Sequence, residues 1–230
     1  MSDWETYVRA HPRLVGPDTA VTVGESYAWD RGAVDALPVL SGLLTGATVT
    51  PVVVGSKDAE LLAWDGPTGR RGWLCRPPQG ELPIDVLPLH QELWRSWGGI
   101  INVFGAPTHE NAYGGDDTWW SPNHREVLTA SSAADERTFV EAVELYAWAW
   151  EDEDLQVPID PAEFALVAKE ANGNLTAAHR RTGEVVMFAP DHAYAGVSER
   201  EGCPPYSLYT IDGGADLAAW IELAAGQWVA

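Results

Sequence analysis

The chain has 230 residues, 12 of them Trp, and carries a formal net charge of −20 at pH 7. Because 46% of the residues are hydrophobic, the chain can bury a sizeable core, and this composition excludes a disordered protein. An acidic surface repels phosphate groups, so direct binding of nucleic acid or of an anionic membrane is not expected. The charge would instead attract a basic partner; the alternative is that the excess acids only increase solubility.

The sequence lacks the patterns of export and of membrane insertion. No apolar stretch approaches the roughly 18 residues that a membrane span needs. The segment after Met1 has neither the basic nor the apolar region of a signal peptide. We therefore expect a cytoplasmic protein.

The first 80 residues combine turn-forming residues with short runs that predict strands. A helical turn or two is expected at 4–9, and a weak helical pattern covers 34–44. Strands are predicted at 20–24 and 47–54, and a hairpin at 60–64 and 72–76. The cluster of Pro77, Pro78 and Gly80 then marks a boundary. We predict an N-terminal β-rich extension or small subdomain over 1–80 and a second domain over 81–230.

The middle of the chain predicts a helix, a strand, a long loop and a second helix. The first helix has one apolar face and ends at Gly98 and Gly99, as glycine favours; the strand covers 100–104. A loop at 114–123 carries Trp119 and Trp120. Ser132 with Asp135 resembles a capping box. The helix that it opens has one stripe of apolar side chains: Phe139, Val143, Tyr146, Ala147 and Trp150.

Four acidic residues stand where this second helix ends: Glu151, Asp152, Glu153 and Asp154. Negative charge at a helix C-terminus opposes the macrodipole. Either the helix frays there, or the acids serve something outside the fold. A solvated charge run before Pro158 is the alternative to a binding role.

The last 70 residues predict three strands and a closing helix. The first two strands, at 163–168 and 175–179, are followed by a turn in which Gly183 supplies a positive φ. A strand at 184–189 completes this hairpin, and a further short strand is expected at 206–211 after a segment rich in Pro and Gly. One face of the final helix is apolar at spacings of three and four: Leu217, Trp220, Ile221, Ala224 and Trp228.

Strands that are grouped, rather than alternating with crossover helices, indicate the α+β class. We therefore predict a mostly antiparallel sheet with helices packed on one side, extended by the β-rich N-terminal region.

The sequence offers no catalytic set. The six His are scattered, and although His179 and His192 flank one hairpin, such a pair is more often structural. Asp116 and Asp117 form a weak acidic pair. With 34 acids in the chain, some pair must lie at the spacing of a two-carboxylate glycosidase, so this enzyme class stays open but has no specific support. Asn174 begins a glycosylation sequon that we attribute to chance. We expect no enzyme activity, no cofactor and no metal site.

The two cysteines, Cys75 and Cys203, lie far apart and form no CxxC motif. Free thiols are the simpler interpretation, and a disulfide between them is the alternative.

Residues from about Leu82 to Trp228 resemble the SUKH superfamily, which includes bacterial toxin-immunity proteins and fungal regulators of cell-wall synthesis. The resemblance lies in the order of a helix with a glycine-rich end, a strand, a hairpin with a Thr-Gly turn, and a closing helix. Where Asn-Gly-Gly is common in the family, this chain has Trp97-Gly98-Gly99. The segments concerned are Leu93-Trp-Arg-Ser-Trp-Gly-Gly99, Ala165-Leu-Val-Ala168, Asn172-Gly-Asn-Leu175, Arg181-Thr-Gly-Glu-Val185 and Asp216-Leu-Ala-Ala-Trp-Ile-Glu-Leu223.

The resemblance implies a SUKH-like fold and a non-enzymatic immunity protein that covers the active site of a cognate basic toxin, often a nuclease or deaminase. An acidic surface suits this role because such a site is built to hold a polyanion. Aromatic residues usually dominate binding at interface centres, although Trp119 and Trp120 could instead be core. The predicted partner-binding residues are Asp116, Asp117, Trp119, Trp120, Glu151, Asp152, Glu153 and Asp154.

Two other functions remain open. A carbohydrate-binding or cell-wall-linked protein, or an enzyme of that kind, would use the many Trp as sugar-stacking platforms around paired acids. A regulatory interaction module without a toxin, like the fungal relatives, is the third hypothesis.

Overall fold

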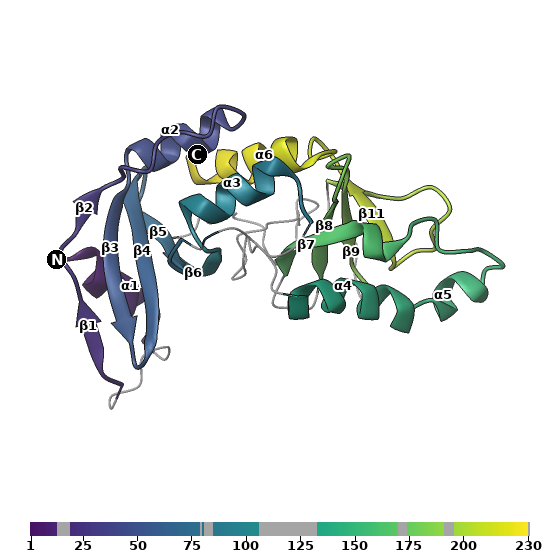
Figure 1. The fold of residues 1–230 in the computed structure, drawn as a ribbon, viewed down its shortest axis with the longest axis horizontal. Helices are drawn as coiled ribbons and strands as arrows, with labels where there is room; N and C mark the ends of the chain where they lie inside the picture. The colour runs from purple at the N-terminus through teal and green to yellow at the C-terminus, as the bar shows by residue number, and fades with distance from the viewer. Residues whose placement is uncertain are drawn as a thin grey trace.

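A computed structural model of the chain shows two antiparallel sheets with helices around and between them (Figure 1). It describes residues 1–12, 19–78, 80, 85–105, 133–169, 174–190 and 196–229. In the helix that begins at Ala133, side chains are described from 139 onward. The α+β class predicted from the sequence is confirmed.

Among the described residues, six strands form the first sheet, in the order β1-β3-β4-β5-β6 with β2 also paired to β3. The last of them lies beyond the Pro77–Gly80 cluster and returns to pair with β5. Residues on both sides of that cluster therefore build one sheet. The strands are β1 (Val21–Val23), β2 (Tyr27–Ala28), β3 (Thr48–Val54), β4 (Lys57–Gly66), β5 (Gly69–Cys75) and β6 (Ile100–Phe104).

Helices cover both faces of the first sheet. On one face, Tyr7 of α1 (Asp3–Ala10) packs with Leu61 and Phe104. The other face packs against α2 (Pro38–Thr45) and α3 (Pro88–Ser96). The predicted one-sided arrangement is thus wrong here. The reason is visible in β4, where every residue from 59 to 64 is buried; since successive side chains of a strand point to opposite faces, both faces need a cover.

Five strands of the described chain form the second sheet, in the order β10-β11-β9-β8-β7. Gly183 has φ 79° in the β8–β9 turn, as predicted. A 3-10 turn at Pro161–Glu163 leads into β7, the first strand of this sheet in chain order. The strands are β7 (Phe164–Lys169), β8 (Leu175–His179), β9 (Val185–Phe188), β10 (Val197–Glu199) and β11 (Leu208–Ile211).

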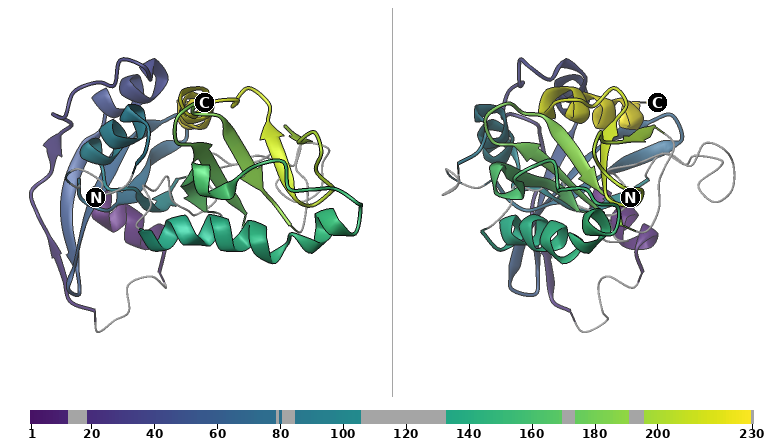
Figure 2. Two further views of the ribbon diagram at one scale, coloured as in Figure 1. Left: turned by 45° about the vertical axis from the view of Figure 1, so that its right-hand side comes forward. Right: turned by 90° about the vertical axis from the view of Figure 1, so that its right-hand side faces the viewer.

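The second sheet is also covered on both faces, as Figures 1 and 2 show. Phe139 and Val143 of α4 (Ala133–Leu145) and Trp150 of α5 (Trp148–Glu151) form one core cluster with β7, β8 and β9. The closing helix, α6 (Leu217–Val229), packs on the opposite face. Residues 164–168 of β7 are all buried, so the one-sided prediction is wrong for the same reason.

The closing helix also joins the two sheets. Trp228 lies with its ring 5.6 Å from that of Trp64 and 5.5 Å from that of Trp73, both edge to face. Glu222 accepts hydrogen bonds from the Val39 and Leu40 amides at the start of α2. Because α2 has no side-chain cap of its own, this carboxylate supplies the partners that its first turn needs.

Candidate partner-binding surface

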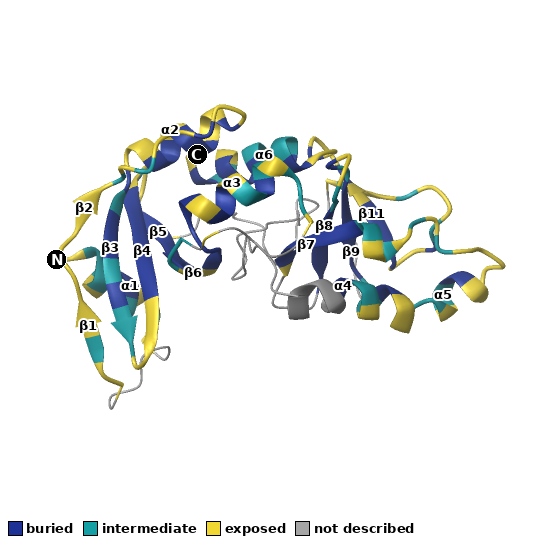
Figure 3. Ribbon diagram, viewed as in Figure 1, coloured by how far each residue is buried: buried dark blue, intermediate teal, exposed yellow. Residues whose placement is uncertain are grey.

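The outward side of α4 and α5 exposes large apolar side chains among acids. Leu145 is 72% exposed and Trp148 is 55% exposed. Glu141 and Glu144 precede them on the exposed side of α4, and the exposed acids at 151–154 follow. Figure 3 shows exposed positions along this side of both helices, away from the sheet. We call Glu141, Glu144, Leu145, Trp148, Glu151 and Asp152 the outer face.

The outer face is continuous across the break between the two helices. The Tyr146 amide donates to the Ala142 carbonyl, and the Ala149 amide donates to the Tyr146 carbonyl at 2.9 Å. These bonds close one ordinary turn and one tighter turn, so the chain stays helical through 146–147. The sequence predicted an unbroken helix here, and the structure adds this tightening. The predicted buried stripe is confirmed at Phe139, Val143 and Trp150.

Trp148 is exposed, but one side of its ring lies near Tyr146, which packs against the core. Its ring lies 6.2 Å from that of Tyr146, and the Tyr146 ring meets Phe188 of β9 edge to face at 5.3 Å. A side chain held against half-buried neighbours loses little conformational entropy when a partner covers it. Trp148 is therefore suited to act as a binding anchor.

The four acids at 151–154 are all exposed, and within the described chain no ion pair includes them. The helix ends in an ordered turn here and does not fray. The Leu155 amide donates to the Trp150 carbonyl and the Asp154 amide donates to the Glu151 carbonyl, which is the Schellman pattern. Asp154 has φ 54°, a left-handed conformation that glycine adopts at less cost.

Negative charge is concentrated in this half of the molecule. Residues 133–230 contain 18 acidic and 5 basic residues, whereas residues 1–105 contain 12 and 8. The outer face thus lies in the more acidic part of the sequence.

Of the eight predicted partner-binding residues, the structure places Glu151, Asp152, Glu153 and Asp154 together beside Trp148. Asp116, Asp117, Trp119 and Trp120 lie outside the described residues. Leu145 and Trp148 were not predicted. Their position opposite the buried stripe of the same helix is the signal that could have indicated them.

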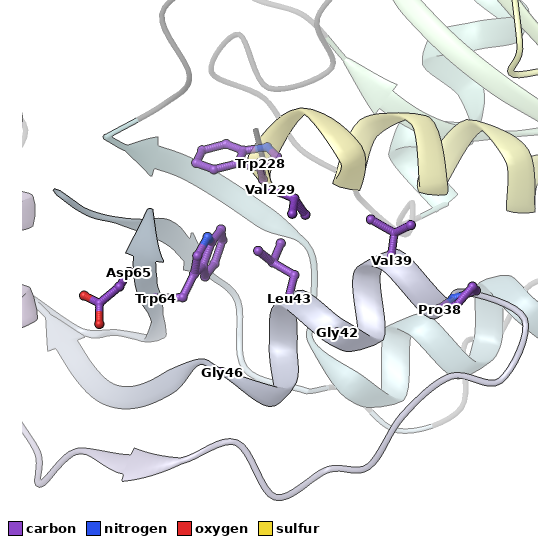
Figure 4. Close-up of a pocket in the computed structure, with 9 residues that line it drawn as sticks. All are labelled: Pro38, Val39, Gly42, Leu43, Gly46, Trp64, Asp65, Trp228 and Val229. Atoms are coloured by element: carbon purple, nitrogen blue, oxygen red, sulfur yellow. The ribbon is translucent and has the colours of Figure 1, made fainter. Parts of the chain in front are cut away.

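A second feature is an apolar pocket of about 620 Å³ where α2 meets the end of α6 (Figure 4). Leu43 and Val39 of α2 and Val229 of α6 form its sides, and Trp64 and Trp228 lie at its inner end. These two indoles are only 3% and 1% exposed. They are therefore core residues that border the pocket and offer no open face for stacking a sugar.

The described residues hold no group of three or more His, Cys, Asp or Glu placed to bind a metal ion. Cys75 and Cys203 are free thiols, and burial raises the pKa of both. His179 accepts hydrogen bonds from the Arg181 and Thr182 amides through Nδ1, a role within the turn, while His192 lies outside the described residues. Asn174 is buried, which agrees with the sequon being a chance match.

No family model, no curated protein and no solved structure matches this chain. Within the part of the chain that the structure describes, no helix is both long enough and apolar enough to span a membrane.

Proposed function

We propose that this chain is a non-enzymatic binding protein that neutralises a basic protein toxin. The observation that carries the proposal is the exposed pair of Leu145 and Trp148, set among outer-face acids that form no ion pair with another described residue. A soluble domain gains no stability from an indole left in water. An exposed aromatic side chain ringed by charge is instead typical of an interface centre with a polar rim.

The charge supports a basic partner. A net charge of −20 speeds the approach of a positively charged protein and keeps polyanions away. A toxin that acts on nucleic acid has a basic active site, because its substrate is a polyanion. Carboxylates such as Glu151 and Asp152 would occupy that site in place of the substrate phosphates. We place this encounter in the cytoplasm.

The resemblance to the SUKH superfamily favours the same function, since that family includes immunity proteins. A regulatory module without a toxin would use the same surface. The presence of a toxin gene beside the gene for this chain would favour immunity over regulation.

The carbohydrate-binding alternative is less well supported by the described Trp side chains. Of those ten, seven are buried, and Trp148 alone falls in the exposed class. A sugar-binding platform would need several exposed rings around a groove. Fluorescence titration with oligosaccharides tests this alternative, and saturable quenching by a glycan would favour it.

The direct test is capture of partners from the native host by the tagged chain, at low and at high salt. We expect a basic protein that is released by salt and whose toxic activity the purified chain inhibits. The matched variant replaces Glu151, Asp152, Glu153 and Asp154 with Lys and should lose most of the inhibition. Equal inhibition by the variant, or no basic protein retained at low salt, would contradict the proposal.

A further inference from the structure

We propose that the outer face of α4 and α5 binds a basic amphipathic helix of its partner. This inference rests on the proposed function and specifies the part of the partner that is recognised. It is carried by the spacing of the exposed side chains, by the satisfied backbone of the two helices, and by the charges that border Leu145 and Trp148.

The exposed side chains follow a helical repeat. Counting from Glu141, they stand at steps of 3, 4, 7, 10 and 11 residues. From Glu141 to Asp152 a helix rises about 17 Å, or roughly three turns. A partner helix of similar length would place its own residues at steps of 3, 4 and 7 along this row.

The backbone of this surface favours a helix over an extended peptide. An extended peptide gains most of its affinity by adding to a sheet edge through main-chain hydrogen bonds. Here the amides of 146, 147 and 149–155 donate to carbonyls of the same helical segment, including Trp150 to Ala147 and Asp152 to Trp148. The outer face therefore offers side chains rather than backbone groups. An amphipathic helix is the element that pairs with such a row.

The acids of the outer face indicate that the partner helix is positively charged. Glu141 and Glu144 lie on one side of the two apolar residues, and Glu151 and Asp152 lie on the other. A complementary helix would have apolar residues at its centre and Lys or Arg at both ends, where they would meet these acids. A second copy of this chain would bring like charges together, so self-association through this face is disfavoured.

The test uses the full-length chain and two fluorescein-labelled peptides of identical composition. One peptide has Leu at helical spacing flanked by Lys and Arg, and the other has the same residues scrambled so that no apolar face forms. Fluorescence anisotropy at about 0.15 M salt measures both affinities. We expect the amphipathic peptide to bind at least about 10-fold more tightly than the scrambled one, a difference of about 1.4 kcal/mol.

Substitutions test whether the amphipathic peptide binds at the outer face. Leu145→Ser and Trp148→Ser should each weaken binding of the amphipathic peptide by about 10-fold or more. Leu223→Ser is the matched control because Leu223 is exposed on α6, away from the outer face, and should leave the affinity unchanged. Circular dichroism checks that each variant is folded.

Equal binding of the two peptides, or an effect of Leu223→Ser equal to that of Trp148→Ser, would overturn the inference. Sedimentation that shows a dimer lost in Trp148→Ser would assign the face to a second copy and would also overturn it. If salt-sensitive capture of a basic toxin persists while the two peptides bind equally, only the helix inference fails. If the amphipathic peptide binds but no toxin is inhibited, the proposed function fails instead.

Discussion

The junction between the two sheets and the outer face of α4 and α5 use the same residue types in opposite ways. At the junction, Trp64, Trp73 and Trp228 are buried and meet edge to face at 4.8 to 5.6 Å between ring centres. On the outer face, Trp148 is exposed and contacts only the edge of the core through Tyr146. Indoles at the junction stabilise the fold, whereas the indole on the outer face is available to a partner.

The acids show the same contrast. Glu222 caps the start of α2 at the junction, whereas Glu151 on the outer face has no ion pair with another described residue. Substitutions at matched residue types therefore test whether stability and binding are separated in this molecule.

Substitution of a buried and of an exposed indole should change stability by very different amounts. Trp228→Ala should lower the free energy of unfolding by about 3 to 5 kcal/mol, because it opens a cavity in the core between the two sheets. Trp148→Ala should change it by no more than about 0.5 kcal/mol, as is usual for exposed positions. Urea unfolding followed by circular dichroism measures both. Equal losses for the two variants would remove the distinction between the regions.

A smaller effect is expected for the acids. Glu222→Ala leaves the Val39 and Leu40 amides without their acceptor and should cost about 0.5 to 2 kcal/mol, the range for loss of a helix cap. Glu151→Ala is the control and should be close to neutral. A loss for Glu151→Ala as large as that for Glu222→Ala would show that the outer acids also stabilise the fold.

The loss of stability at acid pH should also differ between Asp3 of α1, which is paired with Arg70, and the acids of the outer face. Hydrogen bonds from Arg70, with a further bond from Thr48, hold the pKa of Asp3 below its ordinary value of 3.8. The stability that Asp3 contributes, up to about 1 kcal/mol, is therefore complete above pH 3.8 and is lost as the pH falls through the folded-state pKa. In Asp3→Asn this part of the acid-induced loss should disappear.

Asp152→Asn is the control for that experiment, because Asp152 is exposed and lacks an ion pair among the described residues. Thermal unfolding between about pH 2 and 6 compares the two variants with the parent. An acid limb that is the same in Asp3→Asn and in the parent would contradict the role of Asp3.

The smallest effect is a gain. Asp154→Gly should raise the free energy of unfolding by up to about 1 kcal/mol, because glycine adopts φ 54° with less strain. Asp154→Asn removes the charge but keeps a side chain in the same conformation, and so separates the two effects. If Asp154→Asn raised the free energy of unfolding as much as Asp154→Gly does, the cost at this position would come from charge repulsion rather than from backbone strain.

The sequence predicts the elements with a clear local signal. The apolar repeat of α6 and the glycine turn between β8 and β9 are examples, and both are confirmed. The two-residue strand β2 and the three-residue strand β10 were missed, because such short strands are defined by pairing rather than by their own pattern. Helices on both faces could have been expected from the apolar runs at 61–64 in β4 of the first sheet and at 164–168 in β7 of the second.

Long-range contacts carry no such signal. Arg71 donates to the Trp228 carbonyl across 157 positions of the chain, and no local pattern links these two residues. For the outer face, the acids at 151–154 were predicted from their position at the end of a helix, where negative charge opposes the macrodipole, and from the family resemblance. Leu145 and Trp148 lie opposite the buried stripe in the helical repeat, and a stripe of apolar residues indicates the core side of a helix but not which exposed residues bind a partner.

Binding of a basic partner by the outer face is tested by the association rate of the chain with that partner, measured as a function of ionic strength. Wild type is compared with the variant in which Glu151, Asp152, Glu153 and Asp154 are replaced by Lys. We expect the variant to associate several-fold more slowly at low salt and its rate to depend less on salt, because four acids at the contact surface are replaced by positive charges. Identical rates and salt dependence for the two proteins would contradict the claim that the outer face binds the partner.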